Sequence, residues 1–209
     1  PANNTNTFAR ESQIDMMAAA VKVDPLEFRM RNLKDKRMRA VLQGAADSFA
    51  WKSGGVAGNR GQGIACAIDA GTYVVLMAQV HVDPKTGKVQ VERMVCAQDM
   101  GLVVNPSGAS MQTEGGLTMG LGYALTEDVL FSGGQIHNTN FDTYILPRFS
   151  DVPEIESVFV DTGIKESHGG GEPAIITVGG AIGNAIYDAV GARLLQMPMT
   201  PERVLKALG

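Results

Sequence analysis

One carboxylate in this sequence lies in a setting that suits acid–base chemistry. Glu172 follows three consecutive glycines and precedes Pro173. Because glycine has no β-carbon, the segment 169–171 lets a bulky ligand approach the backbone beside this carboxylate. Pro173 disfavours helical dihedral angles at Glu172 and favours an extended backbone there. We therefore predict that Glu172 is a proton acceptor next to a bound ligand.

The residues after Glu172 predict a buried helix, which leaves a second interpretation of that carboxylate. Over residues 174–195, small side chains recur four apart at Ala181, Ala185 and Ala189. This spacing is typical of a helix with a thin face that packs tightly. The dipole of such a helix favours an ionised acid near its start, and capping acids are common at the same place. Glu172 is thus either a catalytic base or a helix cap.

The glycines also fit a dinucleotide-binding fingerprint, which we reject. Gly169, Gly171 and Ala174 match the pattern G-x-G-x-x-A. That fingerprint requires a tight turn from a strand into a helix. Here the polar residues 165–168 separate the preceding apolar run from the glycines, and Pro173 interrupts the motif.

Composition and charge exclude several classes of protein. The 209 residues are 44% hydrophobic and 19% charged, which suits a globular core in one or two domains. A formal net charge of −4 gives no electrostatic basis for binding nucleic acid or anionic lipid. We expect no membrane-spanning helix, because no apolar run approaches the required length. The chain opens on Pro1 rather than Met, so we expect a processed product or a piece of a longer protein.

The cysteines and histidines predict no metal site made by this chain alone. Cys66 and Cys96 are its only cysteines, so it cannot hold a four-cysteine zinc site or iron–sulfur cluster. A disulfide between them is one interpretation, but two buried thiols on separate strands fit the pattern better. His81, His137 and His168 are far apart in the sequence and fit structural or exposed positions. None of these residues indicates a cellular compartment.

The start of the chain predicts a series of helices. We expect one over residues 5–23 and another over 37–49. Between them, Asp24 fits an N-cap, Pro25 fits the first helical position, and Glu27 follows the cap by three residues. This arrangement is a strong local signal for a helix start.

After a glycine-rich, polar stretch at 52–63 the hydrophobic pattern changes to a period of two, which predicts strands. We therefore divide the chain into an N-terminal helical segment, 1–52, and an α+β portion, 53–209. Valines alternate with polar residues in two of the strands, so we expect one face of the sheet to be wet. The expected strands cover residues 64–68, 73–82, 89–96, 129–131 and 155–160. The fold class is α+β, with mixed β-sheets packed by helices.

A further helix is predicted to begin at Asn105, which is followed by Pro106. This helix carries Gln112 and glycines at positions 115, 116, 120 and 122. Glycine costs about 1 kcal/mol relative to alanine in a helix interior. The glycines therefore imply close approach by another group, for which a neighbouring backbone and a cofactor are the two candidates.

These motifs, in this order and spacing, resemble the C-terminal part of the large, molybdenum-binding subunit of the xanthine dehydrogenase/aldehyde oxidase family. The resemblance covers essentially the whole chain and is greatest to the isoquinoline 1-oxidoreductase β-subunit and membrane-bound aldehyde dehydrogenase branch. The stretches that carry it are 8–12 with 24–33, 105–106 with 112–116 and 120–122, and 171–173 with 184–185 and 200–203.

The resemblance implies part of a molybdopterin-binding domain in a molybdenum hydroxylase. Such an enzyme oxidises an aldehyde or an N-heterocycle with water as the oxygen source. By resemblance, Glu172 is the general base, and Gln112 hydrogen-bonds the molybdopterin cofactor. Gly170 and Gly171 would let the metal end of the cofactor come close to that carboxylate. The resemblance gives no metal ligand in this chain.

The resemblance also implies partners beyond these residues. In this family the cofactor lies between this region and loops far upstream, and iron–sulfur clusters lie on another subunit. We expect a fragment or split subunit that needs the upstream part, an iron–sulfur subunit and a small-molecule substrate. Alone, the chain should be inactive, lack stoichiometric molybdenum and form a homo-oligomer through exposed apolar surface. The alternative is a non-catalytic structural domain that keeps the fold without a cofactor.

Overall fold

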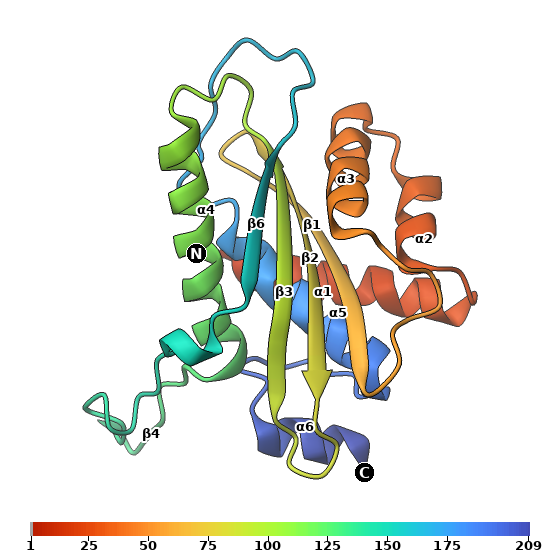
Figure 1. The fold of residues 1–209 in the computed structure, drawn as a ribbon. Helices are drawn as coiled ribbons and strands as arrows, with labels where there is room; N and C mark the ends of the chain where they lie inside the picture. Colours follow the sequence, from red (N-terminus) through yellow and green to blue (C-terminus); the bar gives the residue numbers. More distant parts are fainter. Residues whose placement is uncertain (1) are drawn as a thin grey trace.

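The computed structural model describes residues 2–209, in which helices cover both faces of a four-stranded sheet (Figure 1). The helices are α1 (Ala2–Ala20), α2 (Pro25–Asn32), α3 (Lys36–Phe49), α4 (Pro106–Leu125), α5 (Val178–Val190) and α6 (Pro201–Leu208), with the 3₁₀ turns η1 (Phe149–Asp151) and η2 (Ile175–Thr177). The strands are β1 (Arg60–Asp69), β2 (Thr72–Val82), β3 (Val89–Asp99), β4 (Phe131–Ser132), β5 (Gln135–Ile136) and β6 (Glu154–Phe159).

The main sheet is mixed, with the strand order β1-β2-β3-β6. β1, β2 and β3 form an antiparallel meander, and β6 pairs in parallel with β3. The β2–β3 pairing shifts register between Gln79 and Val80. The turn after β2 places Gly87 at φ +73°, the left-handed conformation that glycine adopts without strain. The predicted α+β class with a mixed sheet is confirmed.

Two predicted helix starts are confirmed by side-chain caps, whereas the helix expected over residues 5–23 covers Ala2–Ala20. The carboxylate of Asp24 accepts hydrogen bonds from the amides of Leu26 and Glu27 at the start of α2. Asn105 Oδ1 accepts from the amide of Gly108, at 3.0 Å, at the start of α4. Each cap satisfies amides that have no partner within the helix.

Helix α5 packs against one face of the sheet almost backbone to backbone. A β-carbon at Gly61 would lie 2.2 Å from the carbonyl oxygen of Ala185. One at Gly63 would lie 2.1 Å from that of Ala181. Glycine is therefore required at these two positions of β1, and the thin helix face predicted from the alanine spacing is confirmed.

Helix α3 covers part of the opposite face. Val41 and Leu42 of α3 share one buried apolar cluster with Val75 and Met77 of β2. A helix of the N-terminal segment is thus packed directly on the sheet. The division of the chain at residue 52 stays a prediction.

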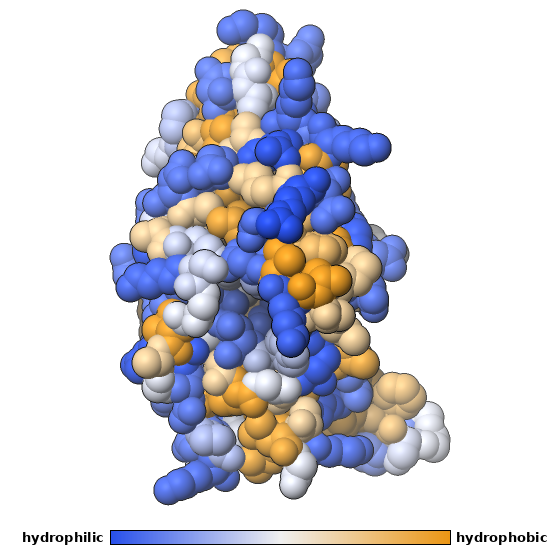
Figure 2. Space-filling view, turned by 90° about the vertical axis from the view of Figure 1, so that its right-hand side faces the viewer, coloured by the Kyte–Doolittle hydropathy of each residue, from blue (hydrophilic) through white to orange (hydrophobic). Residues whose placement is uncertain are grey.

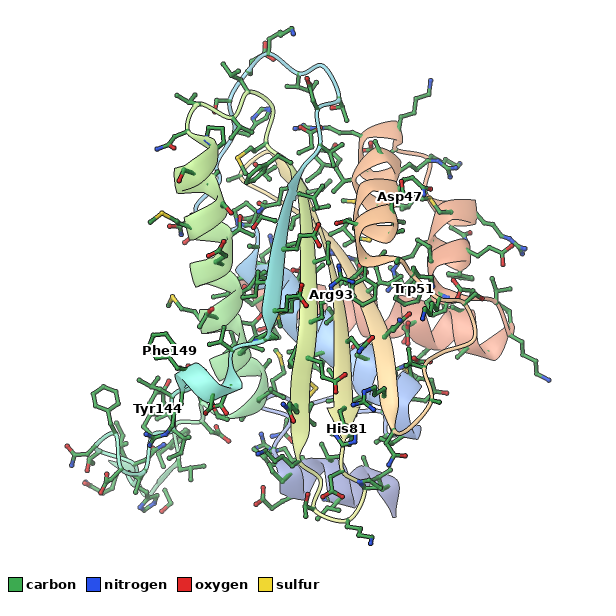
Figure 3. All side chains as sticks on the ribbon, viewed as in Figure 1. Asp47, Trp51, His81, Arg93, Tyr144 and Phe149 are labelled. Atoms are coloured by element: carbon green, nitrogen blue, oxygen red, sulfur yellow. The ribbon has the colours of Figure 1, made fainter. Side chains whose placement is uncertain are left out.

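The part of this face that α3 leaves open is polar. Gln79 and His81 of β2 are only partly buried, and Gln90 of β3 is exposed. Nearby, the guanidinium of Arg93 lies 5.4 Å from the ring centroid of Phe49, and Figure 3 shows Arg93 and His81 on the same side of the sheet. The prediction of a solvent-exposed sheet face is confirmed near the β2–β3 turn, and it is wrong where α3 covers the sheet.

The helix that follows Glu172 is shorter than the predicted stretch 174–195. It begins at Val178, after the 3₁₀ turn η2, and ends at Val190. Gly191 follows at φ +76° and turns the chain out of the helix. Glu172 therefore lies six positions before the helix start, beyond the first turn where the dipole acts.

The strand expected at 129–131 is replaced by a small hairpin, in which Phe131 pairs with Ile136. Gly133 and Gly134 both have positive φ, so the chain reverses after two residues. This hairpin does not join the main sheet, which is why the apolar pattern there does not become a full strand.

The hairpin belongs to an arm, residues 126–153, that extends from the lower end of α4 away from the sheet (Figure 1). Figure 3 shows Tyr144 and Phe149 on this arm. Figure 2 shows apolar patches among polar residues on the face that carries α2 and α3. The expected homo-oligomer stays a prediction. The exposed apolar side chains of the arm include Val129, Leu130, Phe131, Ile136, Phe141 and Phe149.

Among the described residues, no helix combines the length and the hydropathy that crossing a bilayer requires.

Candidate functional site

The segment 166–171 crosses the end of the main sheet on its way to Glu172. The amide of His168 donates to the carbonyl oxygen of Met100 at 2.8 Å, just after β3. The amide of Gly169 donates to the carbonyl oxygen of Ala70 at 3.1 Å, in the turn between β1 and β2. The segment is thus attached to two neighbouring strand ends.

Three glycines make this crossing sterically feasible. A β-carbon at Gly101 would lie 1.9 Å from the carbonyl oxygen of Glu166. One at Gly169 would lie 2.7 Å from the β-carbon of Ala70. At Gly71 it would meet the ring of His168 at 2.7 Å. The sequence analysis interpreted the glycines before Glu172 as room for a ligand. At position 169, however, glycine is needed because the chain packs against Ala70.

The next two glycines differ from Gly169. A β-carbon at Gly170 would approach the sulfur of Met100 at 3.2 Å, a tight contact with a flexible side chain. At Gly171 it would meet no atom within 4 Å. Gly171 and Glu172 are both exposed. The open end of the glycine run is therefore the end beside the carboxylate.

Gln112 lies next to this open end. Its Nε2 donates a hydrogen bond to the carbonyl oxygen of Gly171 at 2.8 Å, although the two residues are 59 positions apart. Gln112 is exposed on α4, so its second N–H and its carbonyl oxygen face outward for other partners. The structure thus brings together Gln112, Gly170, Gly171 and Glu172, the residues that sequence reasoning selected.

The glycines of α4 separate into two groups. At Gly120 a β-carbon would lie 2.4 Å from the side chain of Val178, and Gly116 lies against Ala174. These two allow α4 to pack beside the start of α5. Gly115 meets nothing within 4 Å and lies on the same outer side as the exposed Met111 and Met119. The packing of α5 and the residues before it explains Gly116 and Gly120, whereas Gly115 leaves the surface beside Gln112 open.

A largely buried ion pair supports the strand ends below the site. Arg37 Nε and a terminal nitrogen donate to the two carboxylate oxygens of Asp99, at 2.7 and 3.1 Å. Burial alone would raise the pKa of Asp99. The hydrogen bonds from Arg37, Thr162 and the amide of Gly101 outweigh it and hold that pKa below its ordinary value. Asp99 is therefore ionised in this arrangement at neutral pH.

Sequence reasoning missed Arg37, Thr72 and Asp99 as supports of the site. Asp99 ends β3 but lies three positions beyond the strand predicted at 89–96, so the local pattern gives it little signal. Arg37 and Thr72 carry none, because their contacts with Asp99 and Gly169 join parts of the chain 62 and 97 positions apart.

The cysteine prediction is confirmed: Cys66 on β1 and Cys96 on β3 are free and buried. Burial raises the pKa of each thiol to about 12, so neither is a ready nucleophile or metal ligand. In the described part of the chain, no cluster of three or more histidine, cysteine or acidic side chains could hold a metal ion.

Comparison with known proteins finds relatives of this chain. A family model described as "molybdopterin cofactor-binding domain" matches residues 8–153. One of the subunits of the nicotinate dehydrogenase of Pseudomonas putida is 33% identical over 220 residues, covering 98% of this chain and 18% of that relative. The β-subunit of the isoquinoline 1-oxidoreductase of Brevundimonas diminuta is 34% identical over 197 residues, covering 93% of this chain and 25% of that relative.

A solved structure extends the likeness to the fold. The aldehyde oxidoreductase of Desulfovibrio gigas matches with a TM-score of 0.83 at 17% identity, over 99% of this chain and 41% of that one. The chain spans a quarter or less of the two curated relatives named above. Because the family model matches well over half of its residues, this chain belongs to the molybdopterin cofactor-binding domain family.

Proposed function

We propose that this chain forms the part of a molybdenum hydroxylase that carries the general base, Glu172. The reaction is the oxidation of an aldehyde or an N-heterocycle with water as the oxygen source. The observation that carries the proposal is the bond from Gln112 to Gly171, which places an exposed amide beside an exposed carboxylate in a chain of this family. Two relatives are named for the N-heterocycles nicotinate and isoquinoline.

The residues beside Glu172 fit a molybdopterin cofactor. Gln112 keeps one N–H donor and one carbonyl acceptor beyond its bond to Gly171, which suits the mixed donors and acceptors of a pterin. The backbone at Gly171 is open, so a large planar group can lie against it without meeting a side chain. Gly170 is partly buried against the side chain of Met100, which supports the backbone next to Gly171.

When bound, the cofactor supplies the two-electron redox chemistry, which no residue of this chain supplies. Glu172 contributes proton acceptance. A carboxylate is an effective base when it is held at a fixed position and water is excluded around it. Its loop is held by the sheet end and by Gln112, whereas exclusion of water requires a second wall over the exposed surface of α4 and the loop.

We propose that the second wall comes from the remaining part of the molybdenum subunit. The matched relatives are about four to six times as long as their matched portions, which leaves ample chain for it. We propose that electrons leave through an iron–sulfur subunit, as the family resemblance implies, since two cysteines are too few for a four-cysteine cluster in this chain. The chain by itself would then lack stoichiometric molybdenum and be inactive.

Isotope labelling and metal analysis of the complete assembly test this proposal. The assembly should contain molybdenum and should place ¹⁸O from labelled water in the product of an N-heterocycle, whose ring carbon carries no oxygen that exchanges with water before the reaction. The 209-residue chain alone should contain neither metal nor activity. An assembly without molybdenum and without turnover would instead identify the chain as a non-catalytic structural domain, and a product whose new oxygen does not come from water would contradict the proposed reaction.

A further inference from the structure

The turn between β1 and β2 contacts the segment that leads to Glu172 through both backbone polar groups of Gly169. The amide of Gly169 donates to the carbonyl oxygen of Ala70 at 3.1 Å. The hydroxyl of Thr72 donates to the carbonyl oxygen of Gly169 at 2.7 Å. Thr72 is fully buried whereas Gly169 is exposed, so the bond joins a packed residue of β2 to the surface segment.

The turn is a two-residue hairpin loop, a type that requires positive φ at both of its residues. Ala70 has φ +47° and Gly71 has φ +80°. A residue with a side chain adopts the left-handed region infrequently, and such positions persist where the surroundings determine them. Here the surroundings are the β1–β2 hairpin and the segment packed on it, since Gly169 bonds the carbonyl of Ala70 and the ring of His168 fills the space over Gly71.

The ion pair described above joins this turn to the neighbouring strand end. Besides its two bonds to the carboxylate of Asp99, Arg37 donates to the carbonyl oxygen of Gly71 at 3.3 Å. Asp99 in turn accepts from the amide of Gly101 at 2.9 Å. One guanidinium therefore connects the two strand ends that the segment crosses.

We propose that Thr72 is a positioning residue for Glu172, an inference that rests on the proposed role of that carboxylate as the base. The hydroxyl of Thr72 fixes the backbone three positions before Glu172, while Arg37 and Asp99 hold the strand ends beneath it. Thr72 acts only through Gly169. Because a misplacement of about 1 Å can lower a rate about 100-fold, loss of this bond should affect turnover more than cofactor binding.

Thr72→Val in the complete assembly tests the proposal, because valine keeps the shape of threonine and removes the donor. We expect kcat per bound molybdenum to fall roughly 10- to 100-fold, with KM and molybdenum content nearly unchanged. Hydrogen exchange should rise in the peptide that covers 166–172 and stay unchanged in β2 and β3. Thr72→Ser, which keeps the hydroxyl, should restore both values.

Thr86→Val is the matched control. The hydroxyl of Thr86 bonds Asp83 at 2.8 Å in the turn at the opposite end of β2, so its loss should change neither kcat nor exchange at 166–172. The proposal is overturned if Thr72→Val keeps full turnover per molybdenum. It is equally overturned if Thr72→Val raises exchange throughout the sheet, which would indicate a general loss of stability.

A parallel Glu172→Gln variant separates this proposal from the proposed function. If Glu172→Gln keeps its activity while Thr72→Val loses turnover and loosens 166–172, the base is another group and Thr72 still positions the segment. If Glu172→Gln loses turnover and Thr72→Val does not, Glu172 remains the base and Thr72 is excluded as its positioning residue.

Discussion

The side-chain amide of Gln112 donates a hydrogen bond to the carbonyl oxygen of Gly171, the residue directly before Glu172, at 2.8 Å. Helix α4 therefore does two things at this surface. It presents an exposed amide, and it fixes the end of the loop that carries the carboxylate. A cofactor that bonds Gln112 would lie beside Glu172 without any rearrangement of the chain.

Gln112→Ala should lower the molybdenum content of the complete assembly. The alanine removes the donor and acceptor offered to the cofactor, while Glu172 keeps its attachment through Gly169 and Thr72. Turnover per bound molybdenum should stay near normal, as measured by metal analysis and steady-state kinetics, because the bond from Gln112 is exposed and water can replace it at the carbonyl oxygen of Gly171. Gln43→Ala, at an exposed glutamine of α3, is the control and should change neither quantity. Full molybdenum content in Gln112→Ala would remove Gln112 from the cofactor site.

Two glutamate–arginine pairs should differ sharply in their contribution to stability. Glu11 and Arg29 pair at 3.2 Å with side chains 1% and 2% exposed, whereas those of Glu27 and Arg31 are 53% and 60% exposed. Glu11→Gln removes the nearer countercharge of a buried guanidinium, which keeps only Asp15 at 3.9 Å, and should lower the free energy of unfolding by about 3–5 kcal/mol. Glu27→Gln should change it by less than about 1 kcal/mol. Urea unfolding of the 209-residue chain measures both, and equal effects would contradict the structure.

The Arg37–Asp99 pair should make stability depend on pH in the acid range. The folded-state pKa of Asp99 is lowered, so its stabilising contribution is complete above the unfolded-state pKa of about 3.9. That contribution is lost as the pH falls through the lowered folded-state value. Arg37→Met removes the main partner, so its deficit in unfolding free energy should be largest at pH 6 and should shrink below about pH 4. A deficit that is independent of pH, measured by urea unfolding, would contradict the assignment.

The local patterns of this chain predict most of its elements. Asp24 before Pro25 and Asn105 before Pro106 mark helix starts because the cap and the proline act within four residues. The alternating strands and the turn at Gly87 are likewise short-range signals. The small hairpin at Phe131 is the exception, since its apolar residues have no sheet edge to join.

The candidate site is predictable only in part. Gly171 and Glu172 can be recognised as candidate site residues from the sequence, because they are adjacent in it. The reason for a glycine at position 169 cannot be recognised in this way. The atoms that exclude a β-carbon there belong to Ala70, about a hundred positions away in the sequence. The bond from Thr72 likewise depends on how the β1–β2 turn meets the segment 166–171 in space. The spacing of neighbouring residues in the sequence does not predict such long-range contacts.

The central claim is that Glu172 accepts the proton in the reaction, and Glu172→Gln in the complete assembly tests it most directly. Glutamine keeps the shape of the side chain and removes proton acceptance, and Gln112 and the glycines remain to hold the cofactor. Turnover per bound molybdenum should fall by about 10²- to 10⁴-fold with molybdenum content unchanged. A variant that keeps most of its turnover per molybdenum, or one that loses the metal instead, would contradict the assignment of Glu172 as the base.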